Sequence, residues 1–137
     1  MTKLENNWRQ KSLENLEKVY WGHPQYDSHL VIRSHEIRKL PLSELNNDDI
    51  AMMIRQQFSL DYLVPLAIEK LEVDPLAFGE CGTEGAIMEA ILKIDADFWM
   101  INEGYWTIVK RILDNYAECW SFKNQNKFEI ANPNATK

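Results

Sequence analysis

Cysteine is scarce in this chain, and long apolar runs are missing. Of its 137 residues only Cys81 and Cys119 are cysteines, too few for the disulfide framework of a small secreted domain. The longest strongly apolar stretch, residues 63–68, is far shorter than the ~20 residues that a membrane span needs. The first residues contain no apolar signal segment. We therefore expect a soluble cytoplasmic protein with free thiols and no membrane partner.

Metal-binding and nucleotide-binding motifs are also absent from the sequence. There are three histidines, and His29 and His35 are six residues apart, about 240° around a helix, so they do not share a face. The three histidines, His23 included, are more simply surface or cap residues, and no HExxH or CxxC spacing occurs. The glycines of residues 79–85 lack the lysine of a phosphate-binding loop. We predict no metal site and no cofactor.

Catalytic candidates are confined to one short stretch. Cys81 precedes an expected helix N-terminus, which can lower the pKa of a thiol, and Glu80 with Glu84 is a possible acid/base pair. An inert cysteine and a carboxylate in a first helical turn explain the same residues. We predict no catalytic residue, with a small cytoplasmic enzyme using Cys81 or Glu80/Glu84 as the alternative.

The residues that are present suit one folded domain. Hydrophobic residues make up 45% and charged residues 26%, with five each of Trp, Tyr and Phe as bulky core material. The length matches a single domain over 1–137, with its core at about 12–120. Apolar residues recur at helical spacing and no strand alternation is evident, so the expected fold is all-α: a single compact bundle of six or seven helices.

Local signals indicate where these helices begin and end. The expected N-caps are Ser12, then Asp27 or Ser28, then Asn47, and further helices cover residues 63–71 and start near 83 and 95. Three details follow. Pro65 is expected in a first turn. Phe58 is expected to share the apolar face that begins at Ile50, and Gly104 to separate the last two helices. The polar segment 121–137 is expected to fray as a flexible tail.

Net charge is distributed very unevenly. The total is −6, from 15 basic and 21 acidic residues. Residues 1–40 hold seven bases and five acids, and residues 102–137 hold five and four. Residues 41–101 hold three bases and twelve acids, a balance of −9. An acidic chain is a poor general nucleic-acid binder, but a strongly acidic segment suits a basic partner, unless it is only a solvated surface.

An ordered set of segments resembles one known family. The segments are Trp21-Gly22-His23-Pro24, Asp27-Ser28-His29-Leu30-Val31, Leu40-Pro41-Leu42-Ser43-Glu44-Leu45, Asp48-Asp49-Ile50, Met53-Ile54-Arg55-Gln56-Gln57, Leu63-Val64-Pro65-Leu66-Ala67-Ile68-Glu69-Lys70-Leu71 and Asp74-Pro75-Leu76. Over residues 12–100 the chain resembles the immunity proteins of bacterial contact-dependent growth inhibition (CDI) systems. It departs from that pattern at residues 79–84, where aromatic residues are missing.

The resemblance implies a non-catalytic protein that binds the C-terminal toxin domain delivered by a neighbouring cell and protects its own cell. Such toxins are often nucleases, which need basic residues to hold phosphate, so an acidic inhibitor can compete for the same groups. We expect a monomer that forms a heterodimer with a basic toxin domain and no direct contact with nucleic acid. A helical adaptor or antitoxin for an unrelated partner is the other alternative.

Acidic residues placed outward by helical phase, or in a loop, are the candidate toxin-binding residues. Asp48 and Asp95 are set aside because each has a role at a helix start. The candidates are Glu69, Glu72, Asp74, Glu80, Glu84 and Glu89.

Overall fold

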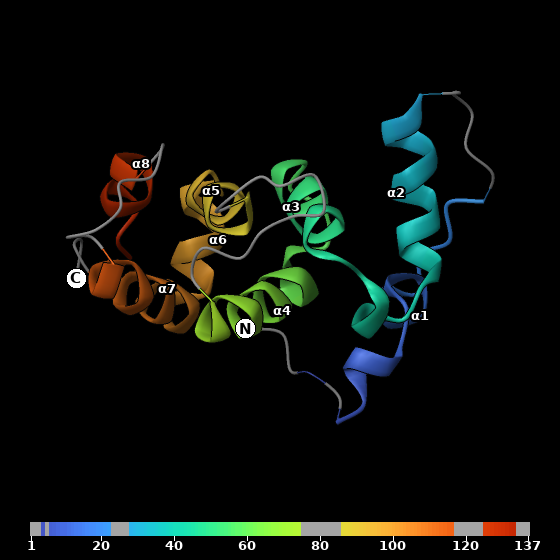
Figure 1. The fold of residues 1–137 in the computed structure, drawn as a ribbon, viewed down its shortest axis with the longest axis horizontal. Coiled ribbons are helices and arrows are strands. Elements are labelled where there is room, and N and C mark those ends of the chain that lie inside the picture. The colour runs from blue at the N-terminus through green and yellow to red at the C-terminus, as the bar shows by residue number, and fades with distance from the viewer. Residues whose placement is uncertain (1–3, 5, 23–27, 75–85, 117–124, 134–137) are drawn as a thin grey trace.

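The computed structural model describes residues 4, 6–22, 28–74, 86–116 and 125–133. Within these residues the chain is all-α, as predicted, with eight α-helices, two short 3₁₀ helices and no strand (Figure 1). In chain order the elements are η1 (Trp8–Gln10), α1 (Leu13–Glu17), α2 (His29–Lys39), η2 (Leu42–Glu44), α3 (Asn47–Arg55), α4 (Leu60–Val73), α5 (Ala86–Leu92), α6 (Ala96–Ile101), α7 (Glu103–Tyr116) and α8 (Gln125–Ile130).

Side-chain caps set the starts of the first three helices. The Ser12 and Ser28 hydroxyls each accept a backbone N–H three residues later, at 3.2 Å, which confirms both as N-caps. The third cap is Asn46, one residue before the predicted Asn47. Asn46 and Asp49 form a reciprocal capping box, because the Asp49 carboxylate also accepts the Asn46 N–H.

Two predicted helix boundaries are wrong. Helix α4 begins at Leu60, so Pro65 lies in its second turn, where the ring removes one intrahelical hydrogen bond. The break between α6 and α7 is at Asn102, and Gly104 lies within α7. The Asn102 side chain is buried and donates to the Phe98 carbonyl at 2.9 Å, which caps α6 where the backbone turns.

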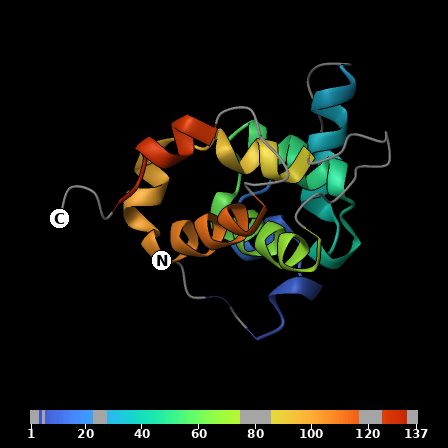
Figure 2. The same cartoon turned by 60° about the vertical axis from the view of Figure 1, so that its left-hand side comes forward.

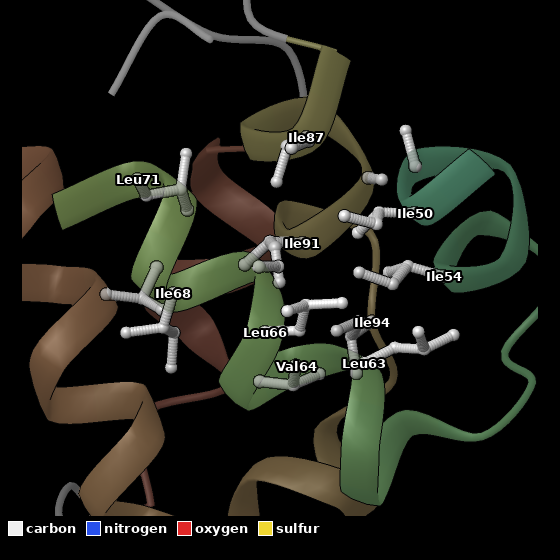
Figure 3. Packing of buried hydrophobic residues seen from close by; sticks show 14 of the residues in the cluster. Ile50, Ile54, Leu63, Val64, Leu66, Ile68, Leu71, Ile87, Ile91 and Ile94 are labelled. Carbon is white, nitrogen blue, oxygen red and sulfur yellow. The ribbon is translucent and has the colours of Figure 1, made fainter. Parts of the chain in front are cut away.

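The core is built by α3, α4 and α5. Figure 3 shows isoleucines of α3 and α5 meeting leucines and Val64 of α4, and α3 packs most extensively against α5. The residues labelled there are Ile50, Ile54, Leu63, Val64, Leu66, Ile68, Leu71, Ile87, Ile91 and Ile94, and all are buried. This apolar interior supplies the hydrophobic free energy that holds the bundle together.

The C-terminal segment departs from the expected frayed tail. Within 121–137, residues 125–130 form α8, and Phe128 on it is fully buried. The Phe128 ring stacks on Trp106 at 5.1 Å between centroids and meets Trp99 edge-on at 5.4 Å. Trp106 Nε1 also donates to the Phe128 carbonyl at 3.0 Å. One aromatic residue in a polar stretch is enough to dock the helix, because a buried ring contributes a large apolar area.

The N-terminal segment runs antiparallel along α4. Glu17 accepts a hydrogen bond from Ser59 at 3.0 Å, just before the first turn of α4, and Arg9 of η1 pairs with Glu69 two and a half turns later. Helix α2 stands at one edge of the molecule, and α8 lies at the opposite side, in both views (Figures 1 and 2). Helix α4 contacts the N-terminal segment near both of its ends, through Ser59 and Glu69, and also packs against α7.

Candidate interaction surface

Basic residues from both ends of the chain fold back onto the acidic segment 41–101. Four of its carboxylates pair with bases from outside it. The Arg33 Nη2 to Asp49 Oδ2 distance is 2.7 Å, Arg9 Nε to Glu69 Oε1 is 2.9 Å, Arg111 Nη2 to Glu72 Oε1 is 2.5 Å and Lys127 Nζ to Asp95 Oδ1 is 3.4 Å. The charge separation along the sequence is therefore partly neutralised in the folded molecule.

Glu69 and Glu72 lie one turn apart on α4, and their ion pairs are exposed. Their side chains are 41% and 46% exposed, and their partners Arg9 and Arg111 are 46% and 60% exposed. Solvent-exposed ion pairs of this kind contribute about 0–1 kcal/mol. A partner that brings its own cations can therefore replace these arginines at little cost.

Asp74 follows the same helix as its C-cap and is exposed. The C-terminal end of a helix carries the negative end of the macrodipole, so Glu69, Glu72 and Asp74 reinforce a negative potential already present there. We call these three residues the acidic end of α4. Among the predicted site residues, the structure brings these three together on one helix.

The other predicted site residues are not part of this group. Glu89 is half-buried on the neighbouring helix α5. Glu80 and Glu84, with Cys81, lie outside the described residues.

Carboxylates perturb several ionisable side chains. The hydrogen bond that Arg9 donates to Glu69 raises the pKa of Arg9, and the bonds that Arg33 donates to Asp49 raise the pKa of Arg33. On α7, burial and then the nearby Asp61 carboxylate raise the pKa of Tyr105. The two arginine shifts follow from pairing with carboxylates, whereas the tyrosine shift follows mainly from burial.

A buried arginine, Arg38, which is not among the predicted site residues, connects the elements at the edge of the molecule beside α2. Arg38 is only 2% exposed, and its guanidinium donates to Glu17 Oε1 at 2.6 Å, to the Val19 carbonyl at 2.8 Å and to Ser59 Oγ at 3.3 Å. Its Cζ lies 4.5 Å from the centroid of the Trp21 ring. The sequence signal was Ser34 and Arg38 four residues apart on the inward face of α2, a polar stripe at helical spacing.

Trp21 packs against Phe58, and the residue before it in the chain is the exposed Tyr20. We call Tyr20, Trp21 and Phe58 the aromatic surface. The Trp21 ring meets His35 edge-on at 5.0 Å and Phe58 edge-on at 5.3 Å. Tyr20 is 68% exposed and Phe58 is 36% exposed. The prediction that Phe58 shares the buried face of α3 is wrong, because α3 ends at Arg55 and the chain then changes direction.

Left-handed backbone conformations flank both parts of the aromatic surface. Lys18 has φ of 60°, Gln57 of 62° and Ser59 of 53°. For residues with a Cβ this region costs about 1–2 kcal/mol relative to right-handed helical geometry. The left-handed conformations at Gln57 and Ser59 turn the chain sharply on either side of Phe58, and the Phe58 ring contacts Trp21.

Replacing Gln57 with glycine is expected to stabilise the protein. The substitution relieves left-handed strain of about 1–2 kcal/mol, against about 0.5–1 kcal/mol for the extra freedom of glycine in the unfolded chain. We expect a gain of up to about 1 kcal/mol in the free energy of unfolding, measured by urea denaturation. Gln56→Gly is the control, since Gln56 has φ of −85° and its substitution should only destabilise. A Gln57→Gly protein less stable than the parent would contradict the strain argument.

The described residues contain no cluster of three or more His, Cys, Asp or Glu side chains suited to a metal ion. Of the histidines, His35 is tied to the Gly22 carbonyl at 3.2 Å, and His23 lies outside the described residues. A cavity of about 480 Å³ between α6 and α8 is lined by Ala96, Lys127, Ile130 and Ala131. No helix in the described part of the chain has the length and apolar character to span a bilayer.

The chain matches the model of one known protein family. The model of a family described as CDI immunity proteins matches residues 15–109, well over half of the chain. No curated protein and no solved structure matches the chain. The matched residues extend from α1 into α7, so they include the core helices, the aromatic surface and the acidic end of α4. The chain belongs to the CDI immunity protein family, whose role is immunity against a CDI toxin.

Proposed function

We propose that the chain protects its cell in the cytoplasm by placing the acidic end of α4 on the cationic substrate-binding surface of a CDI toxin domain, and that this toxin is a nuclease. The family match over residues 15–109 is the observation that carries the immunity role, and it implies an inhibitor that acts by binding rather than by catalysis. The concentration of acid supports the finer statement, because a nuclease surface that holds phosphate is basic.

The charge arrangement suits rapid capture. Glu69, Glu72 and Asp74 lie at the negative end of a helix dipole, and complementary charge steers a basic partner into contact before short-range contacts form. The arginine partners of Glu69 and Glu72 come from η1 and α7, and exchanging an exposed intramolecular ion pair for an intermolecular one costs little.

The direct test is co-expression with the toxin domain encoded by the adjacent gene. We expect the two proteins to co-purify, and growth to be restored in cells that express the toxin domain. Degradation of RNA or DNA in cells that express the toxin domain alone is the expected sign of a nuclease. Failure to co-purify together with failure to rescue growth would refute the proposal, and intact nucleic acid in poisoned cells would refute the nuclease part.

The acidic end is tested by neutralising it. Glu69→Gln, Glu72→Gln and Asp74→Asn together are expected to slow association with the toxin domain on the order of tenfold at low salt, measured by stopped flow. The difference should shrink at high salt, where screening removes the steering. Asp114→Asn is the matched control for each of these three substitutions made singly, because Asp114 is also an exposed, ion-paired acid but lies on α7, outside segment 41–101. Equal slowing by the control would show that net charge matters and the position does not.

A further inference from the structure

We propose that the aromatic surface, Tyr20, Trp21 and Phe58, is the anchor of the toxin interface. It would receive apolar and guanidinium groups of a basic toxin domain lying along α4. This inference rests on the proposed function and deepens it, because it separates the residues that hold the complex from the acids that speed its formation.

The aromatic surface consists of residue types that are common in protein interfaces. Tryptophan, tyrosine and arginine are the residues most often found at the energetic centres of protein interfaces, and aromatic side chains supply large contact area with few rotatable bonds. Here Tyr20 and Phe58 are 68% and 36% exposed although each is large and apolar enough to be buried. Trp21 is half-buried and is in contact with Phe58.

The Trp21 ring is already fixed in place in the free protein. Trp21 is held on one face by Arg38, at 4.5 Å, and along its edges by His35 and Phe58. Arg38 is itself fixed by hydrogen bonds to Glu17 and to the Val19 carbonyl. A surface already rigid in the free protein loses less conformational entropy when a partner binds.

The carboxylates along α4 are complementary in charge to a basic partner. Asp61, Glu69, Glu72 and the C-cap Asp74 give this helix four carboxylates against a single base, Lys70. The chain's own guanidinium groups also show what its tryptophans accept: Arg9 lies 4.6 Å from the Trp8 centroid, as Arg38 lies over Trp21. A basic partner rich in arginine fits both the carboxylates and the ring faces.

The aromatic surface and the acidic end of α4 are close enough for one partner to contact both. Phe58 lies two residues before the start of α4, and the acidic end is at the other terminus of that helix. Fourteen residues of helix span about 20 Å at ~1.5 Å per residue. An interface of standard size covers about 800 Å² on each partner, roughly 30 Å across, so one toxin domain can contact both. The N-terminal segment connects the two along the same flank, from the Ser59–Glu17 contact to the Arg9–Glu69 pair.

The test separates dissociation from association. The double variant Tyr20→Ala, Phe58→Ala is expected to raise the dissociation rate of the toxin complex by about 30-fold or more, as for loss of an anchoring aromatic residue. Its association rate should stay within about twofold of the parent rate, and the effect should persist at high salt. Neutralising the acidic end should do the opposite, lowering mainly the association rate.

Controls keep the result specific. Met100→Ala with Ile101→Ala removes comparably exposed apolar groups from α6, 48% and 71% exposed, and should leave dissociation unchanged. Phe58→Tyr should retain the parent rate, and Tyr20→Ala alone serves if the double variant unfolds. An unchanged dissociation rate, or an equal rise in the α6 control, overturns the anchor and leaves the immunity role intact. If the unaltered protein does not bind the toxin domain, the proposed function fails first, and the anchor with it.

Discussion

Arg38→Ala is expected to lower the free energy of unfolding by about 3–5 kcal/mol, the cost of removing one partner from a buried ion pair. The substitution leaves the Glu17 carboxylate, only 25% exposed, without its cation, and the Val19 carbonyl without its donor. It also uncovers the Trp21 face that the guanidinium packs against. Urea denaturation followed by circular dichroism measures the change.

Arg9→Ala is the matched control for this prediction. Arg9 also pairs with a glutamate and lies over a tryptophan, but it is exposed, so its loss should cost less than about 1 kcal/mol. Replacing both members of the buried pair, Arg38→Met with Glu17→Leu, should be less destabilising than Arg38→Ala alone, because no charge is left unpaired. A loss at Arg38 no larger than that at Arg9 would show that the buried network contributes little.

Phe128→Ala is expected to cost about 3–5 kcal/mol, the range for truncating a fully buried aromatic residue. The ring fills the space between Trp99 and Trp106, so its removal leaves a cavity that neither indole can close without leaving its own packing. The Trp106 hydrogen bond to the Phe128 carbonyl weakens with it, because that bond depends on α8 staying docked. Thermal denaturation and the change in tryptophan fluorescence report the effect.

Ile130→Ala is the control on the same helix. Ile130 is 82% exposed, so its truncation should change stability by less than about 0.5 kcal/mol. If Phe128→Ala were as mild, the segment 125–133 would contribute little to stability, as expected of a frayed tail.

The helical fold was predictable because its signals are local. Apolar residues at helical spacing placed α3, α4, α5 and α7, and serine hydroxyls at Ser12 and Ser28 marked two helix starts through bonds that span three residues. The errors arose where neighbouring residues compete for the same position. Asn46 and Asn47 are equally good N-caps by residue type, and the reciprocal hydrogen bonds with Asp49 select Asn46. Gly104 looked like a break, but Asn102 caps α6 through its own side chain.

Long-range partners were beyond the reach of the sequence. Nothing in the linear order indicates that Arg111 meets Glu72 or that Arg9 meets Glu69, since a salt bridge depends on where two helices are placed. The exposure of Phe58 depends on the left-handed backbone conformation at Gln57. The sequence did not indicate this turn, because the residue there is not a glycine. Phe128 docks only because two tryptophans from α6 and α7 leave a site for it.

By itself, then, the sequence determined an acidic, all-α domain of the CDI immunity type, because periodicity, capping and motif order are properties of the chain read locally. Only the tertiary structure decided which carboxylates are neutralised from within, that Arg38 is buried beneath Trp21, and that an aromatic surface lies at the opposite end of α4 from Glu69, Glu72 and Asp74. The physical reason is that burial, ion pairing and surface shape depend on distances between residues far apart in the chain, and packing sets those distances.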